Sequence, residues 1–316
     1  RLARAHTGRD IVLRVRNDYM GWADALAPGM FVPVHEADGG QPWGLGGVPR
    51  SIQRLTRYFD FNDTGGFVRL VDRVGKSRVA AVIMEPAFRG VLMPQMGFLE
   101  TIRSLTNDIG AVLIFDEVVT GFRLGMQGGQ GAFGVTPDLA TYGKTLASGL
   151  PVGAVLGRGD IMERLSVRVP PEGRVYHSGT WSGMPLVCAA ALAVLDVLGQ
   201  PDTYPRLNQL GELFASEVQK VIRRHEVPLS VLGTGPLREV AFTDEPVLSP
   251  SQDNLLKVRP EVIKEIWLSL VAEGTLASGK GYMPTLRFFI SLAHSPEDIL
   301  KTVDSLDRAI PRLLGR

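Results

Sequence analysis

Two unbroken apolar runs, residues 79–84 and residues 111–115, are separated by a segment with helical periodicity over residues 97–108. Such a run is typical of a strand buried on both faces, because helices cover both sides of its sheet. Shorter apolar runs at residues 139–142 and 152–156 continue the alternation. The pattern therefore predicts an α/β domain with a mainly parallel sheet.

The C-terminal part of the chain follows another pattern. Helical segments at residues 185–198 and 204–225 are followed by a stretch with proline and glycine at residues 227–235. Beyond it, strand-like and helical segments follow in an α+β order. We therefore expect a large α/β domain over residues 1–230 and a small α+β domain over residues 231–316.

Two features lie near the N-terminus. Residues 27–66 are rich in glycine, proline and aromatic side chains and show no period, which predicts a long loop region. The chain opens on what reads as the end of a helix, closed by Gly8, without an initiator methionine. We expect that the N-terminal part of the large domain is missing.

The charge balance and the lone cysteine exclude several classes of protein. With 34 basic and 33 acidic side chains, the formal net charge is +1, so no broad basic field exists for nucleic acid or an anionic membrane. No uncharged apolar stretch approaches the roughly 18 residues of a membrane span. Cys188 lies in an Ala/Leu run that we expect to be buried, and a single cysteine predicts a reducing, cytoplasmic setting. We expect no metal site.

Asp116 and Glu117 directly follow the apolar run at residues 111–115. The carboxyl end of a central strand is where open α/β sheets bind ligands. One interpretation is therefore that the two acids belong to a binding site. The other is that one acid caps the next helix and the other pairs with Arg123.

Lys144 is the only ionisable residue of the segment 139–156 apart from Tyr142. A lysine with apolar neighbours either extends its amine to the surface or is desolvated, with a lowered pKa. The desolvated state suits nucleophilic chemistry, since only the neutral amine attacks a carbonyl. An aspartate at a strand end, followed by such a lysine, fits pyridoxal phosphate (PLP), whose aldehyde binds the amine and whose ring nitrogen the carboxylate keeps protonated.

Two glycine motifs test other functions. Residues 143–145, Gly-Lys-Thr, lack the earlier glycine of a phosphate-binding P-loop, because Asp138 occupies that position. Residues 129–134 have the spacing of a dinucleotide-binding motif, but they follow a loop. Pro137 also disfavours the helix that would bind the pyrophosphate. A nicotinamide dehydrogenase therefore has little support.

Several motifs resemble, in order and spacing, the class III PLP-dependent aminotransferases, and among these the glutamate-1-semialdehyde aminomutases. They lie at residues 85–86, 97–99, 115–123, 133–138, 143–144, 149–154, 177–185 and 291–298. The resemblance, which covers essentially the whole chain, implies a fold type I PLP enzyme that works as a homodimer with shared active sites. It also implies amino transfer between a small amino acid or amine and a keto or aldehyde acceptor.

The same resemblance implies roles for five residues. Lys144 would form the Schiff base with PLP, and Asp116 would be the partner of the pyridine nitrogen. Val118 would pack against one face of the ring, and Tyr19 would cover the other. Thr180 would hold the cofactor phosphate from across the dimer interface.

Three positions bear on the substrate. The aminomutases place a glutamate where this chain has Leu286, which disfavours the semialdehyde substrate. The next residue, Arg287, either reads a substrate carboxylate or is a structural arginine. Trp181 either lines an apolar substrate pocket or packs in the core. We therefore expect an aminotransferase; the alternatives are an intramolecular aminomutase and a non-catalytic relative that keeps the fold.

Overall fold

The computed structural model describes residues 1–30, 46–243, 245–247, 260–278 and 285–311. The chain divides into two compact units, which are described separately below. Their bounds are Arg1–Arg89 with Pro94–Val197 for unit 1, and Gly90–Met93 with Leu198–Arg316 for unit 2.

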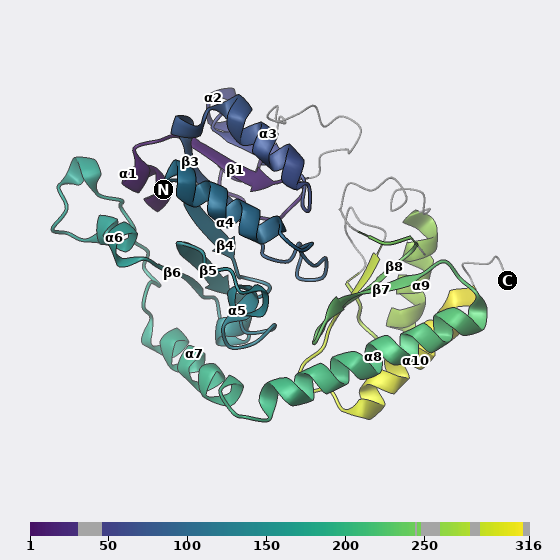
Figure 1. The fold of residues 1–316 in the computed structure, drawn as a ribbon. Helices are drawn as coiled ribbons and strands as arrows, with labels where there is room; N and C mark the ends of the chain where they lie inside the picture. The colour runs from purple at the N-terminus through teal and green to yellow at the C-terminus, as the bar shows by residue number, and fades with distance from the viewer. Residues whose placement is uncertain (31–45, 244, 248–259, 279–284, 312–316) are drawn as a thin grey trace. The chain divides into compact units, whose positions relative to one another are not determined.

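Unit 1 contains a six-stranded sheet in the order β2-β1-β3-β4-β5-β6, in which only β6 is antiparallel to its neighbour (Figure 1). The strands are β1 (Ile11–Val15), β2 (Thr56–Phe59), β3 (Val79–Met84), β4 (Val112–Asp116), β5 (Leu139–Gly143) and β6 (Gly153–Gly157). The helices are α1 (Leu2–Thr7), α2 (Arg50–Gln53), α3 (Thr64–Val74), α4 (Phe98–Ile109), α5 (Gly128–Phe133), α6 (Gly159–Met162) and α7 (Pro185–Leu198), of which only the last residue of α7 belongs to unit 2. The predicted mainly parallel sheet is confirmed.

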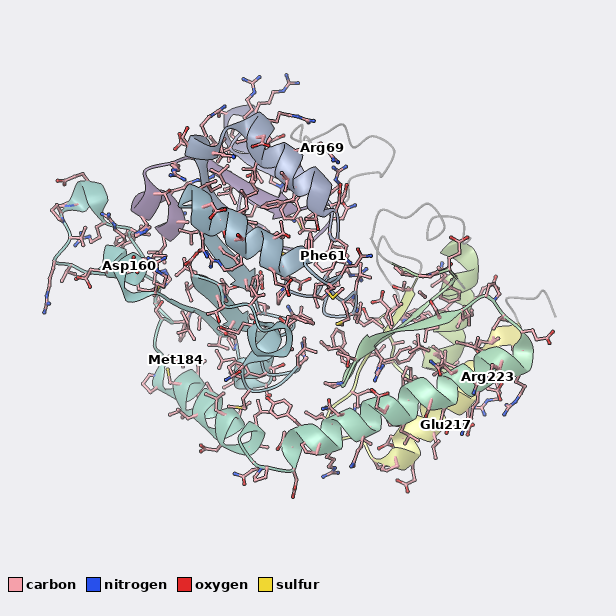
Figure 2. All side chains as sticks on the ribbon, in the orientation of Figure 1. Phe61, Arg69, Asp160, Met184, Glu217 and Arg223 are labelled. Atoms are coloured by element: carbon pink, nitrogen blue, oxygen red, sulfur yellow. The ribbon has the colours of Figure 1, made fainter. Side chains whose placement is uncertain are left out.

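Helices cover this sheet as the apolar runs predict. Figure 1 shows α3 and α4 side by side along the sheet. Ala3 of α1 and Ile161 of α6 belong to a buried cluster with side chains from β1, β3, β4 and β5. In the interior, the ring of Phe61 (Figure 2) packs against Phe88 and Phe98, with ring centroids 5.9 and 5.1 Å apart. The strands are thereby fixed between packed layers.

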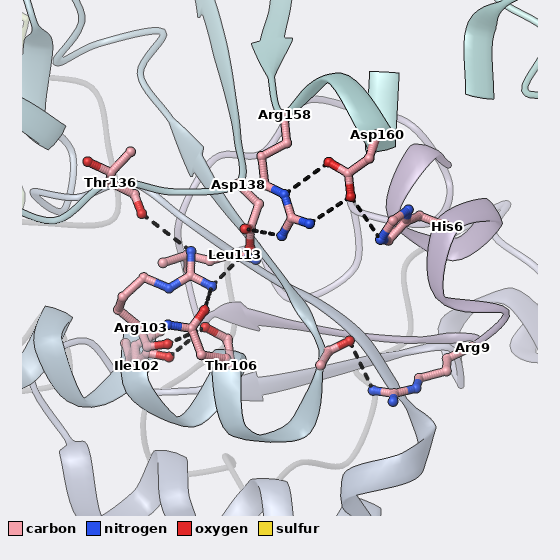
Figure 3. Close-up of polar contacts among 12 residues, drawn as sticks. His6, Arg9, Ile102, Arg103, Thr106, Leu113, Thr136, Asp138, Arg158 and Asp160 are labelled. Atoms are coloured by element: carbon pink, nitrogen blue, oxygen red, sulfur yellow. Dashed lines mark hydrogen bonds and ion pairs between the residues drawn. The ribbon is translucent and has the colours of Figure 1, made fainter. Parts of the chain in front are cut away.

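Asp138 directly precedes β5, and its side chain connects neighbouring elements of unit 1 (Figure 3). Its Oδ2 accepts hydrogen bonds from the Leu113 N–H at 2.8 Å and from Arg103 at 3.0 Å, and its Oδ1 accepts one from Arg158 at 3.0 Å. Although burial opposes ionisation, these donors hold the pKa of Asp138 below its usual value. Structural ion pairs of Asp138 therefore lie at the edge of the sheet that is opposite the carboxyl ends of the parallel strands.

Unit 2 has an α+β fold, which consists of three helices and a three-stranded antiparallel sheet in the order β7-β8-β9. The strands are β7 (Ser230–Thr234), β8 (Leu237–Ala241) and β9 (Thr285–Phe289); the helices are α8 (Thr203–His225), α9 (Pro260–Ala272) and α10 (Pro296–Ala309). Phe214 of α8 packs on Phe288 of β9 with ring centroids 4.8 Å apart. The predicted boundary between residues 230 and 231 falls inside β7. Unit 2 begins earlier than this boundary and includes α8, whose buried side chains belong to the same core.

Two further expectations differ from the structure. The predicted loop at residues 27–66 contains α2 and β2, although residues 31–45 lie outside the described part. The expectation of a buried Cys188 is wrong, because the cysteine is exposed on α7.

Within the described ranges no single helix has the length and hydropathy of a membrane span; only α7 and α8 taken together reach them.

Candidate active site

Parallel pairing brings several polar side chains to one edge of the sheet in unit 1. Because β1, β3, β4 and β5 run in the same direction, their carboxyl ends meet at this edge. The residues that end or follow these strands are Asp18 and Tyr19 (β1), Glu85 (β3), Asp116 (β4) and Lys144 (β5).

The two neighbouring acids after β4 have separate functions. Glu117 is buried, and its carboxylate accepts the N–H groups of Gly129 and Gln130, each at 2.8 Å, so it caps the start of α5. Gly128 leaves room for this cap: its φ is +63°, and a Cβ there would lie 2.6 Å from Glu117 Oε2. The capping interpretation therefore holds for Glu117 and leaves Asp116 available for other chemistry.

Asp116 has an environment that favours its protonated form. Its Oδ1 accepts the Val118 N–H at 3.0 Å. The pKa of Asp116 is raised to about 6: burial and the charge of Asp18 raise it, and the Val118 N–H and the charge of Lys144 partly oppose this shift. Asp116 is thus a carboxyl group whose proton state changes near neutral pH.

Lys144 follows Gly143, the last residue of β5, and begins a short 3-10 helix that ends at Ala147. Its φ of +43° is a left-handed conformation that a lysine rarely adopts. Backbone strain of this kind is concentrated at functional sites. The Lys144 side chain is exposed in this chain, which agrees with the interpretation that its amine extends to the surface and not with the desolvated alternative.

Val118 lies next to the base of Lys144. A Cβ built at Gly143 would be 3.5 Å from Val118 Cγ1, so the valine side chain packs on the residue that precedes Lys144. The structure therefore places Asp116, Val118 and Lys144 at one edge of the sheet, and their roles toward the cofactor stay predictions.

The remaining predicted residues are less closely joined. Tyr19, 60% exposed, follows the buried Asp18 at the same sheet edge. Thr180 and Trp181 are exposed in the segment of unit 1 before α7, so the interpretation of Trp181 as a core residue is wrong. Their roles toward a ligand stay predictions.

Arg287 and Leu286 belong to β9 of unit 2. Arg287 Nε donates to Glu239 Oε2 at 2.7 Å across the β8–β9 pair, which agrees with the ion-paired interpretation. Its Nη2 is buried and makes no hydrogen bond to the described residues. The reading of a substrate carboxylate by Arg287 stays a prediction. Leu286 is fully buried in the core of unit 2.

Sequence reasoning missed Arg14, Asp18 and Glu85 as members of this sheet edge. Glu85 directly follows the buried run of β3, as Asp116 ends that of β4, and this placement is a signal that could have identified it. Nothing in the local sequence distinguishes Arg14 and Asp18 from exposed polar residues. Among the described residues, no three His, Cys, Asp or Glu side chains are arranged to hold a metal ion.

Comparison with known proteins gives consistent results. The sequence pattern of the family "Aminotransferase class-III" matches residues 55–310. The chain is 39% identical over 313 residues to glutamate-1-semialdehyde 2,1-aminomutase 1 of Lachnoclostridium phytofermentans, a match that covers 97% of this chain and 70% of that protein.

Solved structures agree with this result. An omega-transaminase from Sphaerobacter thermophilus is similar with a TM-score of 0.87 and 28% identity, covering 98% of this chain and 70% of that chain. A transaminase with PLP bound is similar with a TM-score of 0.84 and 25% identity, covering 99% of this chain and 70% of that chain.

These findings confirm the fold type I architecture, the PLP cofactor and the class of substrates, a small amino donor and a carbonyl acceptor. This chain therefore belongs to the class-III aminotransferase family of PLP-dependent enzymes.

Proposed function

We propose that Lys144 binds PLP covalently and that Asp116 pairs with the ring nitrogen of the cofactor. The observation that carries this proposal is the meeting of a strained lysine and a half-buried carboxyl group with a raised pKa at the carboxyl ends of β5 and β4. The residues fit the group: the lysine offers an amine for the aldehyde, and the aspartate offers a carboxylate for a protonated ring nitrogen.

Each residue has a physical task in this proposal. PLP, when bound, supplies an electron-withdrawing ring that stabilises negative charge on the substrate carbon. Asp116 would hold a proton at the ring nitrogen, and Val118 and Tyr19 would pack against the two faces of the ring. The Lys144 amine then moves the proton at the substrate carbon.

For the overall reaction we propose transfer to an external acceptor. Intramolecular isomerisation needs a site that retains a ligand with two amino groups through both halves of the reaction. An acid would help to retain that ligand, but at the position of the expected glutamate the chain has Leu286, which is buried in a core. The second candidate, glutamate-1-semialdehyde aminomutation, is favoured by the 39% identity to the relative of that name.

We also propose that a second copy of this chain covers α7. This helix carries a single charged residue, Asp196, yet Leu186 and Leu192 are 61% and 63% exposed. Leu156 of β6 is also exposed. A monomeric protein rarely leaves so much apolar surface in water, and the resemblance implies a homodimer in which Thr180 reaches the partner's site.

A cytoplasmic location also stays a prediction, based on the lone Cys188.

The first prediction concerns the lysine. Borohydride reduction of the PLP-loaded protein should leave a pyridoxyl label on Lys144, found by peptide mass spectrometry. Lys144→Ala should lose both the label and the visible absorption band. Lys76→Ala, which changes another exposed lysine of unit 1, should behave as the wild type. A label on a different lysine contradicts the assignment.

The second prediction concerns Asp116→Asn. The folded-state pKa is about 6 against an ordinary 3.8, so the stability contribution of Asp116 is present below pH 3.8 and is lost as the pH rises through 6. Above pH 6 the apoprotein of Asp116→Asn should therefore be more stable, by up to about 3 kcal/mol, as urea denaturation measures. The same variant should bind PLP more weakly, and unchanged affinity for PLP would argue against the role of Asp116.

The third prediction separates the two candidate reactions. Wild-type protein given an amino donor should release the keto product and then pass the amino group to an added acceptor. Mass spectrometry with a nitrogen-15 donor would detect this transfer. If the enzyme instead converts glutamate-1-semialdehyde without releasing an intermediate, the aminomutase candidate replaces ours.

The fourth prediction concerns the homodimer. Leu192→Glu should place a charge in the interface and shift the protein toward monomers in analytical ultracentrifugation. Leu300→Glu, which changes an exposed leucine of α10, is the matched control and should leave the assembly unchanged. A dimer that survives Leu192→Glu at wild-type strength would place the interface elsewhere.

A further inference from the structure

Three charged side chains that lie near Asp116 are almost fully removed from water. Arg14 and Asp18 are 0% exposed, and Glu85 is 4% exposed. They come from β1, from the turn after β1, and from the residue after β3, so they belong to unit 1 and to the sheet edge of the candidate active site. The proposed roles of Lys144 and Asp116 use none of them.

Asp18 and Glu85 are joined directly. Asp18 Oδ2 accepts the Glu85 N–H at 3.2 Å, and Glu85 Oε2 in turn accepts the Arg89 N–H. Asp18 Oδ1 is buried and has no hydrogen-bond donor among the described residues. A protonated Glu85 would supply a donor to this acid pair, whereas an ionised carboxylate is an acceptor alone.

Arg14 cannot balance two negative charges. Its guanidinium donates to the carbonyl oxygens of Asp18, Leu26 and Pro28, so its donors hold the main chain of the turn after β1. One cation remains beside two buried carboxyl groups. A second unpaired carboxylate in such a space is so costly that it takes up a proton instead.

We propose that Asp18 and Glu85 share one proton, carried by Glu85, and that this acid pair positions the Tyr19 turn and keeps a negative charge beside Asp116. The second half of the proposal rests on the proposed role of Asp116. Asp18 and Glu85 are positioning residues, since neither is assigned a contact with the cofactor.

The charged groups around the pair favour this distribution. Burial and the charges of Asp18 and Asp116 raise the pKa of Glu85 well above its usual range. Burial also raises the pKa of Asp18, but the Glu85 hydrogen bond and the charge of Arg14 oppose that shift. The charge of Lys144 also acts on Asp116 and lowers its pKa. With the proton on Glu85, the two cations balance Asp18 and Asp116.

The negative charge on Asp18 has a consequence for Asp116. It raises the pKa of Asp116, so that this carboxylate attracts a proton more strongly than an ordinary aspartate would. A carboxylate with a higher pKa forms a stronger hydrogen bond to a protonated ring nitrogen. The acid pair would thereby adjust how firmly Asp116 holds that proton.

The first test measures the proton without using the cofactor. Glu85→Gln keeps the shape and the donor of a protonated glutamate, so unfolding of this variant should release no proton there. Above pH 4.5, the ordinary pKa of Glu85, the unfolding constant of the wild type relative to Glu85→Gln should rise by up to about tenfold per pH unit. Urea denaturation of the full-length apoproteins should show a rise of at least about tenfold between pH 5 and pH 7.

Asp138→Asn is the matched control, because Asp138 is a buried acid at the opposite edge of the same sheet with a lowered pKa. Its stabilising effect is present above its ordinary pKa and is lost only as the pH falls, so its ratio to the wild type should be constant from pH 5 to pH 7. A constant ratio for Glu85→Gln as well would overturn the shared proton. Infrared spectroscopy of the folded wild type at pH 8 gives a second readout: the C=O band of a protonated carboxyl should be present, and its absence would overturn the proposal too.

The second test measures the effect on Asp116. In PLP titrations across pH, Asp18→Asn should shift the acidic limb of the affinity profile downward by at least about half a pH unit, since it removes the charge that raises the pKa of Asp116. Asp138→Asn should leave the limb in place. If Asp116→Asn abolishes the limb and Asp18→Asn does not move it, the influence of the pair is refuted while the role of Asp116 stands. If Asp116→Asn has no effect, the proposed function fails, and the first test still decides whether the proton is shared.

Discussion

Parallel hydrogen bonding between β1, β3, β4 and β5 determines where the chemistry of this chain can occur. The register aligns Met84 with Phe115 and Asp116 with Thr141, so residues far apart in sequence follow their strands at one level of the sheet. The opposite edge is closed by the ion pairs of Asp138. Because of this asymmetry, acids and amines that end or follow the parallel strands are brought together at one edge of the sheet.

The central strands could be predicted because burial on both faces leaves a pattern in the sequence: the runs at residues 79–84 and 111–115 match β3 and β4 within one residue. β2 and β7 could not, since each is short, contains polar residues or glycine, and takes its structure from a neighbouring strand. In the site, strand position indicated Asp116, and the lack of other charged residues around it indicated Lys144; their roles stay predictions. The buried ionisable groups of Arg14, Asp18 and Glu85 were missed, because hydrogen bonds such as that between Asp18 and Glu85 form only in the folded chain.

Cys188 shows another limit of sequence patterns. The Ala/Leu composition of α7 indicates that the helix avoids water, but it does not say whether the cover comes from the same chain or from another molecule. The prediction assumed the first, and the exposed cysteine and leucines contradict that assumption. The same distinction applies to Lys144, which is exposed here although its neighbours are apolar or small.

Arg14 links two properties that are usually discussed apart. From its position in β1, its guanidinium donates hydrogen bonds to carbonyl groups of the turn that carries Tyr19, and its charge acts on Asp18 and Asp116. The position of the turn that carries Tyr19 and the acidity of Asp116 therefore depend on one guanidinium. A lineage that remodels this turn to accept a different ligand would also alter the proton balance of the site, so shape and acidity are constrained to evolve together.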